Sequence, residues 1–300
     1  MNWTGAATLS AAILSLVNVI DSHLVSKRFP SLQAFLVPVS IIHLTTGLIA
    51  FLLFPLPKGV GIIPLLVALS SGILRTAAVS IMLYMFKKED VSRVVPIVYT
   101  YPIFVAIMAV PLLGESLNYL QWLAILIVVA GAMVVSAENS LTGAAARLGK
   151  PFLFLFVSSL LTAVADIAGK YSLSYISFWN LFSLVSFSLS GIFMVFSIRP
   201  HVLKELKNLE QKKVIAGFLA FNEMMAPVAL VLSYWAMQRG PVSLVSAIIG
   251  SRPVFVAIYS LLLGMVFPGF LIRSTIRKIV ILRLLATAMI FSGISIIYLT

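Results

Sequence analysis

The sequence contains no cysteine and few charged residues. Without cysteine the chain has neither a disulfide framework nor a thiolate-bound metal site. Charged residues make up 10% of its 300 residues, far below the roughly 25% of a soluble domain. So few charges cannot cover the surface of a water-soluble domain of this length. We therefore expect lipid to surround most of the chain.

Motifs that would indicate an ATP-driven pump or an enzyme are also missing. The sequence has no GxxxxGKS or GxxxxGKT nucleotide loop, no HExxH helix and no GxSxG elbow. The nearest approach to a catalytic cluster is Asp21-Ser22-His23. The sequence thus predicts a protein that is not an enzyme and has no cofactor or metal. An intramembrane enzyme acting on a lipid-linked substrate is an alternative with less support.

Apolar residues, by contrast, are abundant and occur in long runs. They make up 61% of the chain, and the mean hydropathy is +1.11. About 20 apolar residues span the roughly 30 Å bilayer core as a helix, and in lipid a helix pairs all its own backbone groups. The first run lacks a basic leader and a cleavage site, so it is interpreted as a retained span. Together they predict an all-α polytopic membrane protein with ten transmembrane helices near residues 4–25, 32–54, 62–85, 94–113, 119–136, 152–173, 176–198, 214–237, 243–264 and 282–299.

Lysine and arginine are distributed unevenly between the two sides of these helices. Sixteen of the 21 follow the first, third, fifth, seventh and ninth runs, and two lie in the gaps on the opposite side. Cytoplasmic loops of membrane proteins carry the excess of these residues. We therefore expect a multi-pass plasma-membrane protein with both termini on the extracytoplasmic side.

One phrase of the sequence occurs twice, half a chain apart. Residues 101–107 read YPIFVAI and residues 252–258 read RPVFVAI, with five of seven positions identical. The same alignment places Ser92 on Ser243. These matches predict two repeats of five helices each, and an odd number of spans makes the second repeat inverted. Inverted repeats around a midplane site are typical of secondary transporters.

The first half carries a family resemblance. Residues 91–135 resemble the EamA-type ten-helix members of the drug/metabolite transporter (DMT) superfamily. The features that carry the resemblance are Pro102, the pair Gly114-Glu115 and Gly131 in the next helix. The second half resembles the same pattern over residues 240–264 and 291–299, although Gly264 is followed by Met265 instead of glutamate.

The resemblance implies both a fold and a function. Two EamA-like repeats, residues 1–144 and 145–300, would surround a central cavity lined by helices 1–4 and 6–9, with helices 5 and 10 peripheral. The implied function is a permease or exporter that moves a small metabolite by alternating access, without nucleic acid and with a homodimer as one assembly. A flippase for a lipid-linked substrate is the alternative on the same fold.

Ionisable residues inside spans are costly and therefore suggest function. Asp21, Asp166, Glu223 and His43 are the candidates for proton or ion coupling, because carboxyl and imidazole groups can exchange protons. Other interpretations are structural. Asp166 and Lys170 have the spacing of an intrahelical ion pair, and His43 alone would be a hydrogen-bonded packing residue.

The repeat suggests where a substrate would bind. Arg252 stands where the first copy has Tyr101, so a fixed positive charge breaks the symmetry between the halves. Such a charge would orient an anionic or zwitterionic molecule, whereas a salt bridge from Arg252 to Glu223 is the competing interpretation. The full set of substrate-binding candidates is Arg252, Arg75, Tyr101, Tyr99, Tyr84, Trp235, Lys170, Asn180 and Asn222.

Three prolines lie inside predicted spans. Pro102 and Pro253 occupy equivalent places in the fourth and ninth helices, and Pro227 follows Glu223 by four residues. Proline lacks the N–H that would bond the carbonyl four residues earlier, so the backbone is loosened there. The three are therefore candidates for gating hinges, with static kinks as the alternative.

Overall fold

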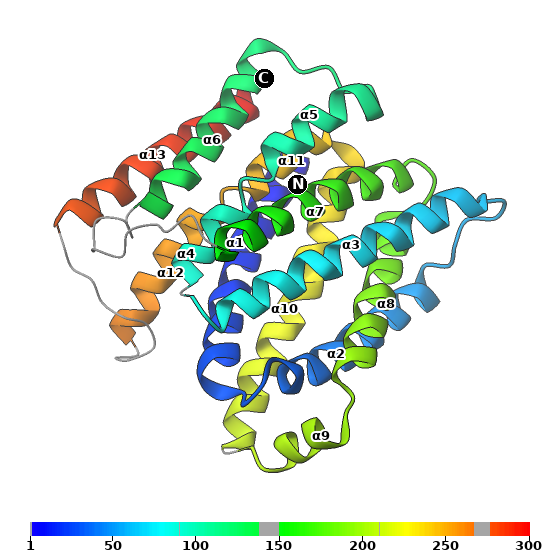
Figure 1. Cartoon of the computed structure of the whole chain (residues 1–300). Coiled ribbons are helices and arrows are strands. Elements are labelled where there is room, and N and C mark those ends of the chain that lie inside the picture. The colour runs from blue at the N-terminus through cyan, green and yellow to red at the C-terminus, as the bar shows by residue number, and fades with distance from the viewer. Residues whose placement is uncertain (1, 90, 138–149, 210, 267–276) are drawn as a thin grey trace.

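The structure, a computed structural model, describes residues 2–89, 91–137, 150–209, 211–266 and 277–300. Every regular element in these ranges is a helix (Figure 1). The boundary expected between the two repeats, at residues 144 and 145, lies outside the described residues.

Eight helical segments of the described part are long and apolar enough to cross a membrane. Two further apolar helices, α6 (Tyr119–Ala137) and α13 (Arg277–Leu299), contain shorter apolar stretches. The protein is therefore an all-α membrane protein, and each of the ten expected runs coincides with one of these segments. The unbroken spans are α1 (Trp3–His23) with its π-helical continuation η1 (Leu24–Arg28), α2 (Leu32–Leu53), α3 (Ile62–Phe86), α7 (Lys150–Ser172), α8 (Phe178–Ser197) and α10 (Lys212–Arg239).

The fourth and ninth expected spans each consist of two helices. In the fourth, three residues separate α4 (Val91–Val98) from α5 (Pro102–Leu113). In the ninth, α11 (Val242–Ile249) is separated by two residues from α12 (Arg252–Val266). We call residues 99–101 the first break and residues 250–251 the second break. Both breaks adjoin the phrase that occurs twice in the sequence.

Prolines explain where the helices begin again. Pro102 is the first residue of α5 and Pro253 is the second residue of α12. Proline fits the first turn of a helix because its missing N–H would have no intrahelical partner there. Pro227 behaves differently, because α10 runs past it from Lys212 to Arg239. The backbone loosening expected around Pro227 therefore does not interrupt that helix.

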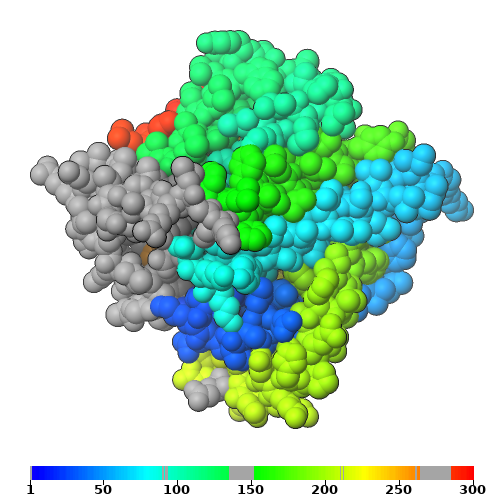
Figure 2. Space-filling model, in the orientation of Figure 1, coloured from blue at the N-terminus to red at the C-terminus, as the bar shows by residue number. Residues whose placement is uncertain are grey.

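Helices from the two halves of the chain pack against each other in pairs. α1 packs on α10, α3 on α7, α2 on α8 and α6 on α13. Figure 1 shows α6 and α13 side by side at the edge of the bundle. Figure 2 shows α3, in cyan, between α7 and α8 on one face of the molecule.

Two glycines allow α6 and α13 to approach closely. A Cβ atom on Gly131 of α6 would stand 2.7 Å from Cγ1 of Ile290. A Cβ atom on Gly293 of α13 would stand 2.7 Å from Cγ2 of Val128. Small residues at helix–helix contacts are typical of membrane proteins, since they let backbones come together.

The spans are apolar outside and polar inside, as α10 illustrates. Met224 has 71% of its surface exposed on the outer face of the bundle, which would face lipid. Its neighbours Asn222 and Glu223 are 0% and 3% exposed. Buried polar groups must find partners within the protein, so the interior of the bundle is where a functional site is to be sought.

Candidate functional site

A cavity of about 130 Å³ lies at the centre of the bundle. Its lining comes from the first break and from α1, α2, α3, α4, α7, α8, α10, α11 and α12. None of the described lining residues belongs to α6 or α13. The arrangement implied by the family resemblance is therefore confirmed for this cavity. An apolar cavity of about 150 Å³ holds a molecule the size of benzene, so this one suits a small molecule.

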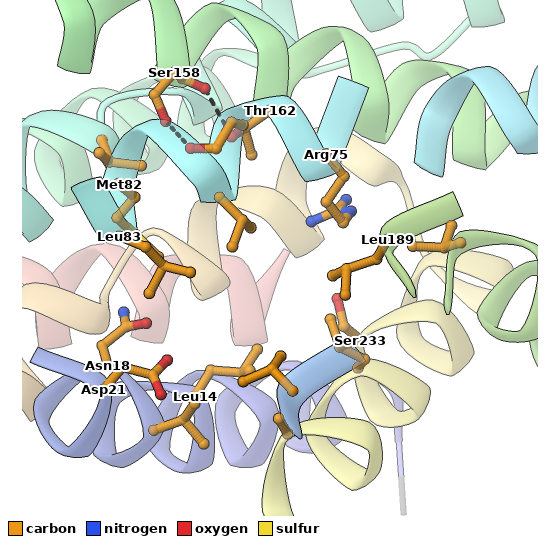
Figure 3. A pocket seen from close by; sticks show the side chains of 18 of the residues that line it. Leu14, Asn18, Asp21, Arg75, Met82, Leu83, Ser158, Thr162, Leu189 and Ser233 are labelled. Carbon is orange, nitrogen blue, oxygen red and sulfur yellow. Dashed lines mark hydrogen bonds between the residues drawn. The ribbon is translucent and has the colours of Figure 1, made fainter. Parts of the chain in front are cut away.

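Most of the lining is apolar, but besides two tyrosines it contains six ionisable side chains. Figure 3 shows Asn18 and Asp21 entering the cavity from α1 and Arg75 from α3. Ser158, Thr162 and Ser233 add hydroxyl groups. All six ionisable residues had been expected from the sequence, and they are Asp21, His43, Arg75, Asp166, Glu223 and Arg252.

Arg75 and Asp166 form an ion pair between α3 and α7. Nη2 of Arg75 donates to Oδ1 of Asp166. Oδ2 of Asp166 accepts a hydrogen bond from the hydroxyl of Ser246 at 2.9 Å. The pair expected between Asp166 and Lys170 is therefore wrong. The ammonium of Lys170 instead donates to carbonyl oxygens near the end of α10, where a cation is favourable, namely those of Met237 at 2.6 Å and Gly240 at 2.8 Å.

Arg252, at the start of α12, contacts the first break. Its Nη1 donates to the hydroxyl of Tyr99, and its guanidinium carbon lies 4.6 Å from the centre of that ring. The tyrosine hydroxyl also accepts from Asn18 Nδ2 at 3.3 Å. Among the described residues Arg252 has no carboxylate partner, and its Nε has no hydrogen-bond acceptor. The salt bridge that we considered between Arg252 and Glu223 is not formed.

Glu223 belongs to a second polar cluster, on the walls formed by α1, α2 and α10. Nδ2 of Asn222 donates to Oδ1 of Asp21 at 2.6 Å and to Oε1 of Glu223 at 3.4 Å. Nε2 of His43 lies 3.6 Å from Oε2 of Glu223. All four side chains are buried. This cluster contains two carboxylates and no arginine or lysine among the described contacts.

Five of the expected substrate-binding residues are not part of the cavity lining, and four of these, all except Asn222, lie away from it. Tyr84 is 44% exposed. The ring of Trp235 lies 4.2 Å from the guanidinium of Arg239. Asn180 caps the first turn of α8 and donates to a backbone carbonyl of α2's end. Lys170, described above, is the fourth. Tyr99 and Tyr101 do line the cavity, and Asn222 contacts it through the two carboxylates.

The contacts of Glu115 were not predicted from the sequence. Its carboxylate accepts hydrogen bonds from the backbone N–H groups of Val242 and Ser243 and from the Ser243 hydroxyl. These groups begin α11, so Glu115 caps that helix from the loop after α5. A negative charge is favourable at a helix N-terminus. The Gly114-Glu115 pair was the available signal, but its spacing does not reveal a partner 127 residues later.

Comparison with known proteins shows which family the first part of the chain resembles. Residues 1–137 match the sequence model of the EamA-like transporter family. The match covers slightly less than half of the chain, and it shows that this part is similar to an EamA-like transporter domain. The resemblance seen in residues 91–135 is confirmed for this half.

Solved structures confirm the fold over the whole chain. In all, 26 chains of solved structures match. One crystal structure aligns over 99% of this chain and 95% of its own, with a TM-score of 0.63 and 19% sequence identity. At that identity the likeness shows the fold alone. No curated protein sequence matches the chain.

Proposed function

We propose that the protein is a secondary transporter that moves a small anionic or zwitterionic metabolite across the membrane by alternating access. The observation that carries this proposal is the central cavity, which both halves of the chain line and which contains the uncompensated charge of Arg252. A buried cation without a counter-ion is unfavourable. A carboxylate or phosphate of the substrate would supply the missing anion.

The helix pairing supports two inverted repeats of five helices. Exchanging the two halves turns the pair α1–α10 into the pair α7–α3, and both pairs are packed. In the pairs α2–α8 and α6–α13 the two helices correspond to each other, so the same exchange leaves each pair unchanged. A two-fold relation between the halves produces this pattern, and the two breaks at equivalent sequence positions fit it as well. Rocking of such halves around a fixed site is the usual route to alternating access.

The proposed substrate anchor lies at a position where the two repeats carry different residues. Tyr101 and Arg252 are equivalent in the repeat, both line the cavity, and they are 2% and 9% exposed. Arg252 would present its guanidinium fork to the anionic end of the substrate, with Tyr99 holding it in place. Tyr101 would contact the less charged end. Arg75 is occupied by Asp166 and contributes shape more than free charge.

The two breaks are the proposed hinges of the transporter. Pro102 is the first residue of α5 and Pro253 the second residue of α12. The breaks before them are bridged by single-turn hydrogen bonds, such as those from Tyr101 N–H to the Val98 carbonyl and from Ser251 N–H to the Ile248 carbonyl, so the two helices of each span can change their angle at little cost. Hinges are commonly a few residues at the ends of elements. Pro227 lies within a continuous helix, and the proposal leaves it out of the gate.

A thermal-shift screen tests the anchor directly. Purified protein is heated with metabolites of different charge classes, because a ligand that binds the folded state raises its melting temperature. We expect stabilisation by an anionic or zwitterionic compound, weakened about tenfold in affinity by Arg252→Lys, since a lysine lacks the guanidinium fork. Arg239→Lys, outside the cavity, is the matched control. Unchanged affinity in a folded Arg252→Lys protein contradicts the anchor, and stabilisation by lipid-linked compounds alone supports a flippase.

A further inference from the structure

We infer that Asp21 and Glu223 form a carboxyl pair that shares a single proton, and that this pair is where the transporter takes up protons. Asp166, the remaining acid of the cavity, is not part of this site. The inference rests on the proposed transport function and names the coupling site within it. It follows from the partners of each acid, one step at a time.

The two carboxylates are held together by a single amide group. The Asn222 side chain has two N–H groups on one nitrogen. That nitrogen lies 2.6 Å from Oδ1 of Asp21 and 3.4 Å from Oε1 of Glu223. Asn222 is fully buried, and the two acids are 9% and 3% exposed. Because both acids lie on the same donor, a charge on either one is felt by the other.

Two buried carboxylates that share a site do not both ionise unless a cation compensates them. The two arginines of the cavity are engaged elsewhere, Arg75 with Asp166 and Arg252 with Tyr99. His43, 3.6 Å from Oε2 of Glu223, is a cation only when it is protonated. One proton on the pair removes the repulsion, leaves a single negative charge and converts one oxygen into a donor. The titratable or charged side chains that line the cavity with the pair are His43 of α2, Arg75 of α3, Tyr99 and Tyr101 of the first break, Asp166 of α7 and Arg252 of α12; the described cavity residues of α8 and α11 include none. Lys27 and Arg28 belong to η1, which packs on α10, and are exposed.

Two acceptor atoms at the pair are unfilled. Oε2 of Glu223 and Oδ1 of Asn222 are buried and have no hydrogen-bond donor in the described structure. An unpartnered buried acceptor is costly, and a carboxyl O–H from either acid would be a donor at this place. A metal ion is the less favoured occupant, since no group of three His, Cys, Asp or Glu residues among those described could hold one.

Asp166 shows what the same sequence position does with a different partner. At an offset of 145 residues, Leu16, Val19 and Asp21 of the first half align with Leu161, Val164 and Asp166 of the second, so Asp21 and Asp166 are equivalent in the proposed repeat. Both oxygens of Asp166 are satisfied, one by Arg75 and the other by Ser246, and its charge is balanced. Asp166 therefore does not need a proton to balance its charge. Asp21 shares its donor with a second acid, Glu223, whereas Asp166 is paired with Arg75. Of the two aspartates, only Asp21 is therefore suited to exchange protons.

Proton counting on purified protein without any substrate tests this inference. The number of protons bound during titration across the neutral pH range is compared between variants. We expect Asp21→Asn and Glu223→Gln each to bind about one proton fewer per molecule than the wild type. The double variant should also lose about one, not two, because the proton is shared. Both amides keep the shape of the acid, and thermal melting confirms that each variant is folded.

Two control variants accompany the proton count, and several results would overturn the inference. Glu115→Gln, at a carboxylate outside the cavity, should leave the count unchanged, as should the paired change Arg75→Gln with Asp166→Asn. Full wild-type counts in both single variants, or a loss of two protons in the double variant, overturn the shared proton. So does a loss confined to His43→Gln, or stabilisation by sodium alone that the acid variants abolish. Since no substrate is present, a negative result leaves the transport proposal standing, and failure of the metabolite screen leaves this count valid.

Discussion

Gly250 in the second break lies against Pro102 at the end of the first. A Cβ atom on Gly250 would stand 2.7 Å from Cγ of Pro102 and 3.1 Å from the carbonyl oxygen of Ala247. The two broken helices therefore touch at the places where they are broken. If these breaks are the hinges of an alternating-access cycle, the contact between them is where the two repeats move against each other.

This contact predicts the effect of adding one methyl group. Gly250→Ala should lower the free energy of unfolding by about 1–3 kcal/mol, because overpacking a close contact forces its neighbours to shift. Thermal or chemical denaturation in detergent measures the change. Gly191→Ala in α8 is the matched control, since nothing lies within 4 Å of a Cβ there. It should be neutral or stabilising. An equal effect at both positions contradicts the contact.

The ion pair between α3 and α7 predicts an asymmetry between single and double changes. Asp166→Asn leaves the partly buried Arg75 without a counter-ion and should destabilise the protein by about 1–3 kcal/mol. Replacing both, by Arg75→Met with Asp166→Leu, should recover most of that loss because no charge is left uncompensated. Denaturation curves of the three variants form the measurement. Equal losses in the single and double variants would show that the two residues act independently.

The cap on α11 makes a prediction for the Gly-Glu pair. Glu115→Ala removes the acceptor for two backbone N–H groups and one hydroxyl, and should cost about 0.5–2 kcal/mol of stability. Ser243→Ala removes the hydroxyl alone and should cost less. Melting temperatures of the two variants give the order. A larger effect for Ser243→Ala would mean that the backbone bonds to Glu115 contribute little.

The distribution of lysine and arginine predicts the orientation in the membrane. Asn2→Cys and Thr300→Cys should react with a membrane-impermeant thiol reagent in intact cells, whereas Lys207→Cys should be protected. The natural chain has no cysteine, so each variant reports on one site. Labelling at Lys207→Cys with protection of both termini reverses the assignment.

The helices were predictable because the bilayer sets their length. Runs of about 20 apolar residues can only be helical spans in lipid. The structure has one helix on each run except the fourth and ninth, which consist of two helices each. Pro102 and Pro253 indicated the positions of the two breaks, since proline is favoured in the first turn of a helix and disfavoured in its interior. The continuous helix through Pro227 shows that a proline inside a membrane helix need not end it.

The partners of the buried charges were not predictable in the same way. Spacing along one helix suggested Asp166 with Lys170, but Arg75 on another helix is the actual partner. Contacts between helices depend on their rotation and relative height, which are decided by packing such as that of Gly131 and Gly293. For the same reason the sequence identified the six ionisable residues of the cavity without showing that Asn222 joins two of them.

Exchange of a labelled ligand by purified protein in liposomes tests the central claim most directly. The ligand is the compound that the thermal-shift screen identifies. The account predicts saturable exchange across the membrane, with an apparent affinity weakened about tenfold by Arg252→Lys and little changed by Arg239→Lys. Flux no greater than that of empty liposomes, for every compound that stabilises the protein, would contradict it.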